Sequence, residues 1–200
     1  MMPLIFSELA SVYRPYEINN PAHPIAAANG QFLLITQEAY VAVGGHRAVG
    51  RSVLEDVELA TNVKRSRRGI WFRYAPDALA TRMYRGLDDM MEGWAKNLAL
   101  LFPHALKLAA WRLLDIILLL LPLALWMDPY LILWQRAAIL LIWARTLWRF
   151  YSRVARSNFS PVDVAVSPLA LPLFIYLLIR SWYLHHVLRR VRWKGRSYPA

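Results

Sequence analysis

The second half of the chain contains apolar runs that approach the length of a membrane span. Residues 113–127 are almost wholly apolar, and with the run extended back to residue 109 they near the roughly 20 residues that cross a bilayer. Residues 164–184 form another such run, interrupted late by Arg180. Residues 130–150 are apolar but carry one glutamine and three arginines, so they either cross with the arginines snorkelling or lie along one surface. We therefore predict two membrane helices and a third that spans or lies at the interface.

The positive charge of the chain is concentrated in the same half. The net charge is +11, but residues 1–107 hold twelve Lys and Arg against ten Asp and Glu, whereas residues 108–200 hold twelve against three. Basic residues that flank apolar segments are typical of membrane proteins, whereas nucleic-acid binders mount them on a polar face. We expect a membrane partner and no nucleic acid. The absence of cysteine excludes disulfides and cysteine-ligated zinc.

Two basic clusters pose a problem of topology. Arg145, Arg149, Arg153 and Arg156 form one helical stripe, and residues 189–196 form a basic tail. Both clusters favour the cytoplasm, yet one crossing by residues 164–184 would place them on opposite sides. Either that segment is a re-entrant hairpin bent at its prolines, or one cluster violates the rule. The nine tryptophans are typical of interfacial belts, and we expect the pair at residues 185–186 to be interfacial histidines, not metal ligands.

The first half alternates between helix and strand signals, which is typical of an α/β domain. A short apolar run entered through Gly30 predicts a buried strand over residues 32–35, and alternation predicts a second over residues 70–74. Apolar spacing and glycine stops predict helices over residues 4–13, 37–43, 55–67 and 87–107. We expect a first domain over 1–107, membrane helices over 108–188 and a basic tail over 189–200.

Adjacent acids at Glu55 and Asp56 open one of the predicted helices. Acids in a first helical turn complement the helix dipole, which is the commoner role of such a pair. The segments around Glu55 and Asp56 in the sequence favour a functional role for the pair. They belong to an ordered series of short segments, of which none is specific alone. The series comprises residues 28–33, 40, 43–46, 54–56, 59–60, 82–85, 92–97 and 193–198.

In this order and spacing, and with the membrane segments, the chain resembles the family-2 glycosyltransferases of the GT-A type. The likeness is greatest to the bacterial membrane group associated with hopanoids and carotenoids. It implies the C-terminal, acceptor-side part of a GT-A α/β domain, followed by two or three transmembrane or interfacial helices. It also implies transfer of a sugar from a nucleotide-sugar donor to a lipid hydroxyl, with Asp56 as general base. Glu55 would then orient the loop or bind the acceptor.

The resemblance also implies a set of binding residues, each with a structural alternative. Glycines let backbone approach a sugar, but they also serve turns. A histidine here either contacts a substrate or supports a turn, and arginines offset either a leaving diphosphate or lipid phosphates. The expected binding residues are Gly30, Gln31, Gly44, Gly45, His46, Arg82, Arg85, Trp94 and Lys96. Processive relatives carry Gln-x-x-Arg-Trp, but Met90 and Gly93 stand where its Gln and Arg would be, which favours transfer of a single sugar.

The chain contains no Asp-x-Asp, the motif that holds a divalent metal in this family. We expect magnesium or manganese in the full-length enzyme, with ligands outside this chain. We also expect a truncated chain, preceded by well over a hundred residues and inactive alone, in a multi-pass cell-membrane protein with a cytoplasmic catalytic part. The alternatives are part of a processive polysaccharide synthase, or a non-catalytic membrane protein that binds anionic lipid.

Overall fold

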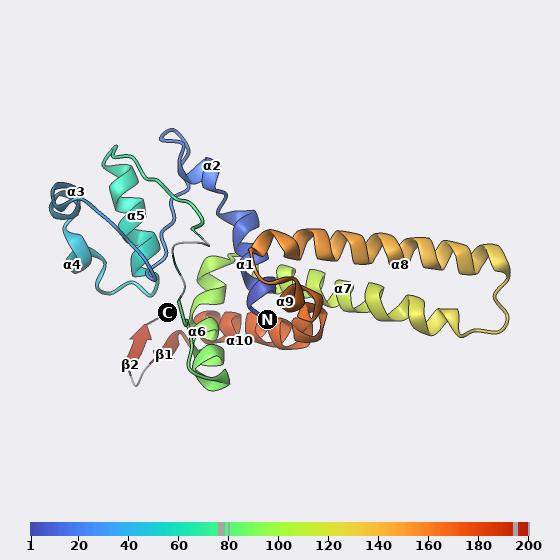
Figure 1. Ribbon diagram of the computed structural model, residues 1–200. Coiled ribbons are helices and arrows are strands. Elements are labelled where there is room, and N and C mark those ends of the chain that lie inside the picture. Colours follow the sequence, from blue (N-terminus) through green and yellow to red (C-terminus); the bar gives the residue numbers. More distant parts are fainter. Residues whose placement is uncertain (76–78, 80, 194–195, 200) are drawn as a thin grey trace.

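The computed structural model describes residues 1–75, 79, 81–193 and 196–199, and its elements are mostly helical (Figure 1). The helices are α1 (Met2–Val12), α2 (Pro15–Ile18), α3 (Gln37–Ala42), α4 (Gly45–Val49), α5 (Glu55–Arg65), α6 (Leu87–Leu101), α7 (Ala105–Trp126), α8 (Leu133–Val154), α9 (Pro161–Ala165) and α10 (Leu171–His186). Two 3-10 turns, η1 (Ala155–Ser157) and η2 (Ser167–Ala170), flank α9. Strands β1 (Arg190–Trp193) and β2 (Arg196–Pro199) pair antiparallel.

One apolar core joins α1, α6, α7, the end of α8 and α10. Buried side chains from each of these helices form it, including Leu4, Trp94, Leu98, Ala109, Phe150, Phe174 and Leu177. Two polar contacts connect α10 to α6. The Ala99 N–H donates to Ser181 Oγ at 2.8 Å, and His185 Nε2 donates to the Lys96 carbonyl at 2.7 Å. The expected boundary at residue 107 therefore runs through a shared core, and His185 is a buried packing residue.

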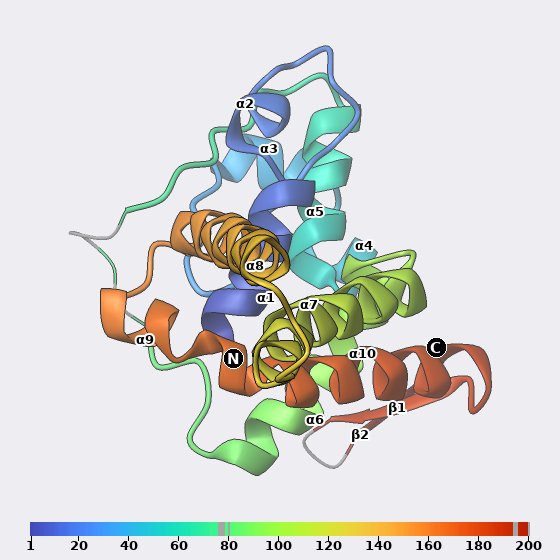
Figure 2. The ribbon, with the colours of Figure 1, turned by 90° about the vertical axis from the view of Figure 1, so that its right-hand side faces the viewer.

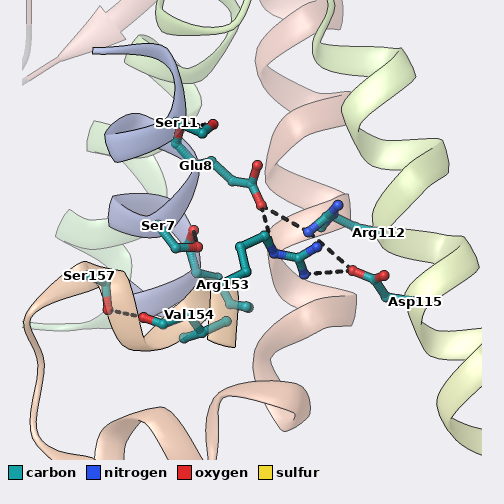
Figure 3. Close-up of polar contacts among 9 residues, drawn as sticks. Ser7, Glu8, Ser11, Arg112, Asp115, Arg153, Val154 and Ser157 are labelled. Carbon is teal, nitrogen blue, oxygen red and sulfur yellow. Dashed lines mark hydrogen bonds and ion pairs between the residues drawn. The ribbon is translucent and has the colours of Figure 1, made fainter. Parts of the chain in front are cut away.

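A closed ring of four charges ties α1 to the start of α7 and the end of α8 (Figure 3). Arg112 Nη1 lies 2.9 Å from Glu8 Oε1 and 3.1 Å from Asp115 Oδ2. Arg153 closes the ring, at 2.8 Å from Asp115 Oδ2 and 3.7 Å from Glu8 Oε1. Burial raises the pKa of the Glu8 carboxyl, and the two guanidiniums oppose that shift. Arg153, one of the predicted helical stripe of arginines, thus belongs to a buried ion-pair network.

Helix α5 is the central helix of the part of the chain that precedes the long apolar helices. Its buried face consists of Leu59, Ala60 and Val63, at helical spacing. Its acids occupy the first turn and its basic residues the last, as the helix dipole favours. In that last turn, Lys64 Nζ donates to the carbonyls of Ile18 at 2.8 Å and Ile25 at 2.6 Å. One ammonium group therefore holds the proline-rich segment against α5.

The predicted helices are confirmed, with one correction to their extent. Helices α1, α3 and α5 lie where apolar spacing predicted them. The helix expected over residues 87–107 is two helices, because α6 ends at Leu101 and α7 begins at Ala105. Pro103 lies between them, and the residue before a proline disfavours helical geometry. The short helices α2, α4 and α9 carried too little periodicity to be predicted.

The two strand predictions in the first half are wrong for this structure. Residues 32–35 form a turn and an extended segment whose Phe32 and Leu34 are 60% and 88% exposed. In residues 70–74, the N–H and carbonyl of Phe72 bond to the side-chain amide of Asn19, at 2.6 and 3.0 Å. A strand requires a neighbouring strand, and neither segment has one among the described residues. The α/β GT-A class therefore stays a prediction.

Helices α7 and α8 form an antiparallel hairpin that projects from the core (Figure 1). Within the hairpin, the indole N–H of Trp143 donates to the Leu119 carbonyl at 3.0 Å, three residues before Pro122. Among the described residues, two helical segments are long and apolar enough to cross a membrane, Ala105–Trp126 and Ser167–His186. These coincide with the two predicted spans, and α8 corresponds to the third apolar run.

Candidate active site

The Asp56 carboxylate is fixed by backbone groups at the start of α5. Its Oδ2 accepts the Gly30 N–H at 2.8 Å, and its Oδ1 accepts the Val57 N–H at 2.8 Å. Glu55 and Asp56 both lie in the first turn of the helix, so the dipole-complementing role is also present. A Cβ added to Gly30 would lie 3.5 Å from Oδ2, an ordinary contact. Gly30 thus contributes its N–H to the site, and its missing side chain is not required.

A polar pocket lies at the start of α5, and Asp56 itself is not among the residues that line it. It has a volume of about 220 Å³ and is lined by His46, Val49, Gly50, Ser52, Val53, Glu55 and Lys96. The pocket brings together side chains from α4, α5 and α6, and Lys96 Nζ donates to the Val53 carbonyl at 3.4 Å. A carboxylate, an imidazole and an ammonium group around one small pocket suit a ligand rich in hydroxyl or phosphate oxygens. Three of the expected residues, His46, Glu55 and Lys96, therefore meet here.

The glycine pair supports His46 through Tyr40. The Tyr40 hydroxyl accepts the His46 backbone N–H at 3.0 Å and lies 2.8 Å from the imidazole Nδ1. A Cβ on Gly45 would lie 2.6 Å from the Tyr40 ring, and Gly44 and Gly45 have φ of 76° and 54°. Both positions therefore require glycine. The phenol oxygen already accepts one N–H, and we predict that it donates its own proton to Nδ1, which would place the imidazole N–H on Nε2.

We expect Gly45→Ala and Tyr40→Phe to release the His46 imidazole from this tautomer. Nitrogen-15 NMR of histidine-labelled chain in detergent micelles measures the change, with His46→Gln to assign the signal. The native His46 should carry its proton on Nε2, and both variants should shift toward a mixture of tautomers. Gly69→Ala is the matched control, because a Cβ there meets no atom within 4 Å. An unchanged His46 spectrum in Tyr40→Phe would refute the assignment.

The other expected binding residues lie away from the pocket lining. Gln31 is exposed, and its N–H donates to the Asn29 side chain at 3.1 Å. Arg82 and Arg85 are exposed in the irregular segment before α6. Trp94 is only 2% exposed and packs edge-on against the rings of Phe6 and Tyr84, at 6.2 Å each. In this structure Trp94 is a core residue, because α6 turns it toward α1.

The ring of Tyr84 lies over Gly93, beside Trp94, and burial of this ring changes the pKa of its hydroxyl. A Cβ on Gly93 would lie 2.6 Å from the Tyr84 ring. Burial raises the pKa of Tyr84 to about 12 from the ordinary 10.0. Because the folded-state value is the higher one, the neutral phenol's contribution to stability is complete below about pH 10 and is lost as pH rises through about 12. Phenolate absorbance, compared between the native chain and Tyr84→Phe, should show one group titrating near pH 12. A difference appearing near pH 10 would contradict this prediction.

The sequence reasoning missed Tyr13, which lies at the C-terminal end of α1. Burial raises the pKa of the Tyr13 hydroxyl, and the negative charge of Asp56 adds to the shift. A phenol is therefore near the candidate base. Only the packing of α1 near α5 brings the two together, so no local signal could identify it.

A metal site is not assembled in the part of the chain that the structure describes. No three His, Cys, Asp or Glu side chains gather there as ligands of one ion would. The residues around Asp56 therefore do not fit a divalent-metal centre by themselves.

Comparison with known proteins adds one relationship. The chain is 27% identical over 176 residues to the 4,4'-diaponeurosporenoate glycosyltransferase of Staphylococcus aureus strain USA300, an alignment covering 86% of this chain and 47% of that protein. The protein of the same name from strain MRSA252 is 26% identical over 177 residues, with the same coverage. The chain thus spans about half the length of the curated relatives it matches. No family model and no solved structure matches it.

Proposed function

We propose that this chain is the acceptor-side part of a membrane-bound family-2 glycosyltransferase of the GT-A type. It would transfer a sugar from a nucleotide-sugar donor to a lipid hydroxyl, with the catalytic part in the cytoplasm. The observation that carries the proposal is the Asp56 carboxylate, held by two backbone N–H groups, whose neighbour Glu55 lines a pocket with His46 and Lys96. Similarity to glycosyltransferases along 86% of the chain supports it.

In the proposed reaction, Asp56 takes the proton of the acceptor hydroxyl. As that oxygen forms its bond to the anomeric carbon, the bond from this carbon to the nucleoside diphosphate breaks, and the diphosphate leaves with the electron pair. Gly30 and Val57 keep the carboxylate oriented toward one direction of approach. We assign Glu55, Lys96 and the Nε2–H of His46 to hydrogen bonds with the acceptor or the sugar. The exposed Arg82 and Arg85 would neutralise either the diphosphate or lipid phosphates.

The divalent ion that the resemblance implies would balance the charge of the donor diphosphate. We infer that its ligands belong to the donor-binding part and not to this chain, so the isolated chain should not turn over a sugar nucleotide. Met90 and Gly93 in place of the processive motif's Gln and Arg favour the addition of one sugar. The length of the product distinguishes transfer of a single sugar from polymer synthesis. A polymeric product would indicate that the chain belongs to a polysaccharide synthase.

A chimera provides the test of transferase function. The aligned half of the Staphylococcus aureus enzyme is replaced by this chain, and membranes are assayed for transfer of labelled sugar from nucleotide donors into extractable lipid. We expect labelled lipid with one sugar per acceptor. The unaltered relative is the positive control, and protease resistance of the chimera checks its folding. A folded, membrane-inserted chimera without transfer would contradict the proposal and favour a non-catalytic lipid-binding protein.

A further inference from the structure

The α7–α8 hairpin exposes apolar side chains on both of its helices, and no other part of the described chain covers its far end (Figure 1). Leu120, Leu121 and Leu123 of α7 are about half exposed, and Leu133, Leu141 and Trp148 of α8 are more so. Soluble monomers rarely leave so extensive an apolar surface uncovered. One polar group between the helices is satisfied internally, because the indole N–H of Trp143 bonds to the Leu119 carbonyl. An exposed apolar surface and an internally bonded polar group are both compatible with a bilayer.

The lengths of the two helices fit a crossing. Each helix has 22 residues, or about 33 Å at about 1.5 Å per residue, against a hydrocarbon core of about 30 Å, although Ala105, Ala109 and Arg112 at the start of α7 are buried in the protein core. Among the described residues, α7 is apolar enough to cross by composition, whereas α8 carries Arg136, Arg145 and Arg149 along its length. Exposed aromatics lie at both ends, with Trp126, Tyr130 and Trp134 near the tip and Trp111 and Trp148 toward the base. At the tip, Arg136 donates to the carbonyls of Asp128 and Leu131, at 3.2 and 3.1 Å. The base is more basic, although Arg112 and Arg153 are neutralised within the charge ring.

Helix α10 is also apolar, but one of its apolar faces is buried in the protein core and not exposed as in the hairpin. Its residues Leu171, Phe174, Leu177 and Leu178 are at most 1% exposed, so the protein core already accounts for one face. It packs on both α6 and α7 and also contacts α1, and Ser181 and His185 near its end bond to α6. Strand β1, which begins the basic tail, packs on α6 as well. Figure 2 looks along the hairpin and shows α8 nearly end-on, whereas α10 extends across the hairpin's base.

We propose that α7 and α8 cross the bilayer as one antiparallel hairpin, while α10 stays on the side of α1 and α6 and lies along the interface. Only the tip residues reach the opposite surface. Arg149, Arg153 and Arg156 at the base of α8 then share one side with the basic tail, which removes the conflict that a crossing α10 creates with the positive-inside rule. Arg145 lies about 14 Å from the base end of α8 and reaches that surface by snorkelling. The exposed Tyr176, Ile179 and Tyr183 give α10 an amphipathic face suited to the headgroup region. This topology does not depend on transferase activity.

Cysteine labelling tests the topology directly, because the native chain has no cysteine. Single variants Phe32→Cys, Tyr130→Cys and Val187→Cys place a thiol at exposed positions in the first half, at the tip and after α10. A membrane-impermeant maleimide is applied to intact spheroplasts and to inverted vesicles from a bacterial host. We expect Phe32→Cys and Val187→Cys to react only in inverted vesicles, and Tyr130→Cys only in spheroplasts. Detergent-solubilised samples give the total reactive thiol.

Two results would overturn the proposal. Labelling of Val187→Cys on the same side as Tyr130→Cys would mean that α10 crosses. Labelling of Tyr130→Cys on the side of Phe32→Cys, or protection from both sides, would mean that the hairpin does not cross. Asp128→Cys and Leu188→Cys replace the tip and tail variants if either fails to fold, as judged by its elution from a sizing column in detergent. The readout is independent of activity, so it separates this topology from the transferase proposal.

Discussion

Asp56→Asn is expected to lower sugar transfer by the chimera about 10²–10⁴-fold, the range that general-base catalysis contributes. Asparagine keeps the size of the side chain, and its oxygen can still accept the Gly30 N–H, so the loop should stay in place. What is lost is the carboxylate that takes the proton from the attacking hydroxyl. The assay is labelled sugar recovered in lipid per unit of membrane-inserted protein. Insertion itself should be unchanged, since Asp56 lies outside both candidate spans.

Glu58→Gln is the matched control for this substitution. Glu58 is an exposed acid in the same first turn of α5, so its loss removes the same dipole-complementing charge without touching Gly30. We expect its activity to stay near that of the unsubstituted chimera. Glu55→Gln should have an intermediate effect, because Glu55 lines the pocket but is not the proposed base. Equal activity of Asp56→Asn and Glu58→Gln would assign Asp56 a purely structural role.

Arg112→Met should destabilise the folded chain by about 3–5 kcal/mol, the cost of breaking a buried ion pair. Arg112 is 6% exposed and contacts two carboxylates of the charge ring. Its removal leaves Glu8 and Asp115 to share Arg153, with one buried negative charge uncompensated. Thermal unfolding in detergent at neutral pH, followed by circular dichroism, measures the loss. The effect should be largest at the junction of α1 with the hairpin.

A second substitution makes this prediction specific to charge. Glu8→Gln combined with Arg112→Met leaves the balanced Asp115–Arg153 pair, so we expect it to recover much of the lost stability. Arg145→Met removes an exposed arginine from α8 and should change the melting temperature little. If the double variant is as unstable as Arg112→Met alone, packing of the Arg112 side chain is responsible and not its charge.

The sequence predicted which residues belong to the candidate site, but not which of them lie together. Glu55 and Asp56 could be identified from their place at a helix start. The contact between Gly30 and Asp56 joins two of the expected segments. His46 and Lys96 do meet Glu55 in one pocket. The sequence does not show whether Trp94 is an exposed site residue or a core residue. The orientation of α6 in the fold buries its side chain. Tyr13 carries no local signal, and Tyr40 belongs to the motif series without a predicted contact of its own, because both act through neighbours that the fold supplies.

The helices and the apolar segments could be predicted from the order of residues alone, because helical spacing, proline stops and long uncharged runs act over a few turns of chain. Features that depend on a distant partner could be seen only in the folded structure. Residues 32–35 and 70–74 have strand-like patterns, but a strand forms only where another lies beside it. The arginine at position 153 reads as one of a stripe until α1 and α7 surround it with carboxylates. Likewise α10 and α7 are both apolar, and only the packing of α10 on α6 shows that its apolar face is already covered by protein.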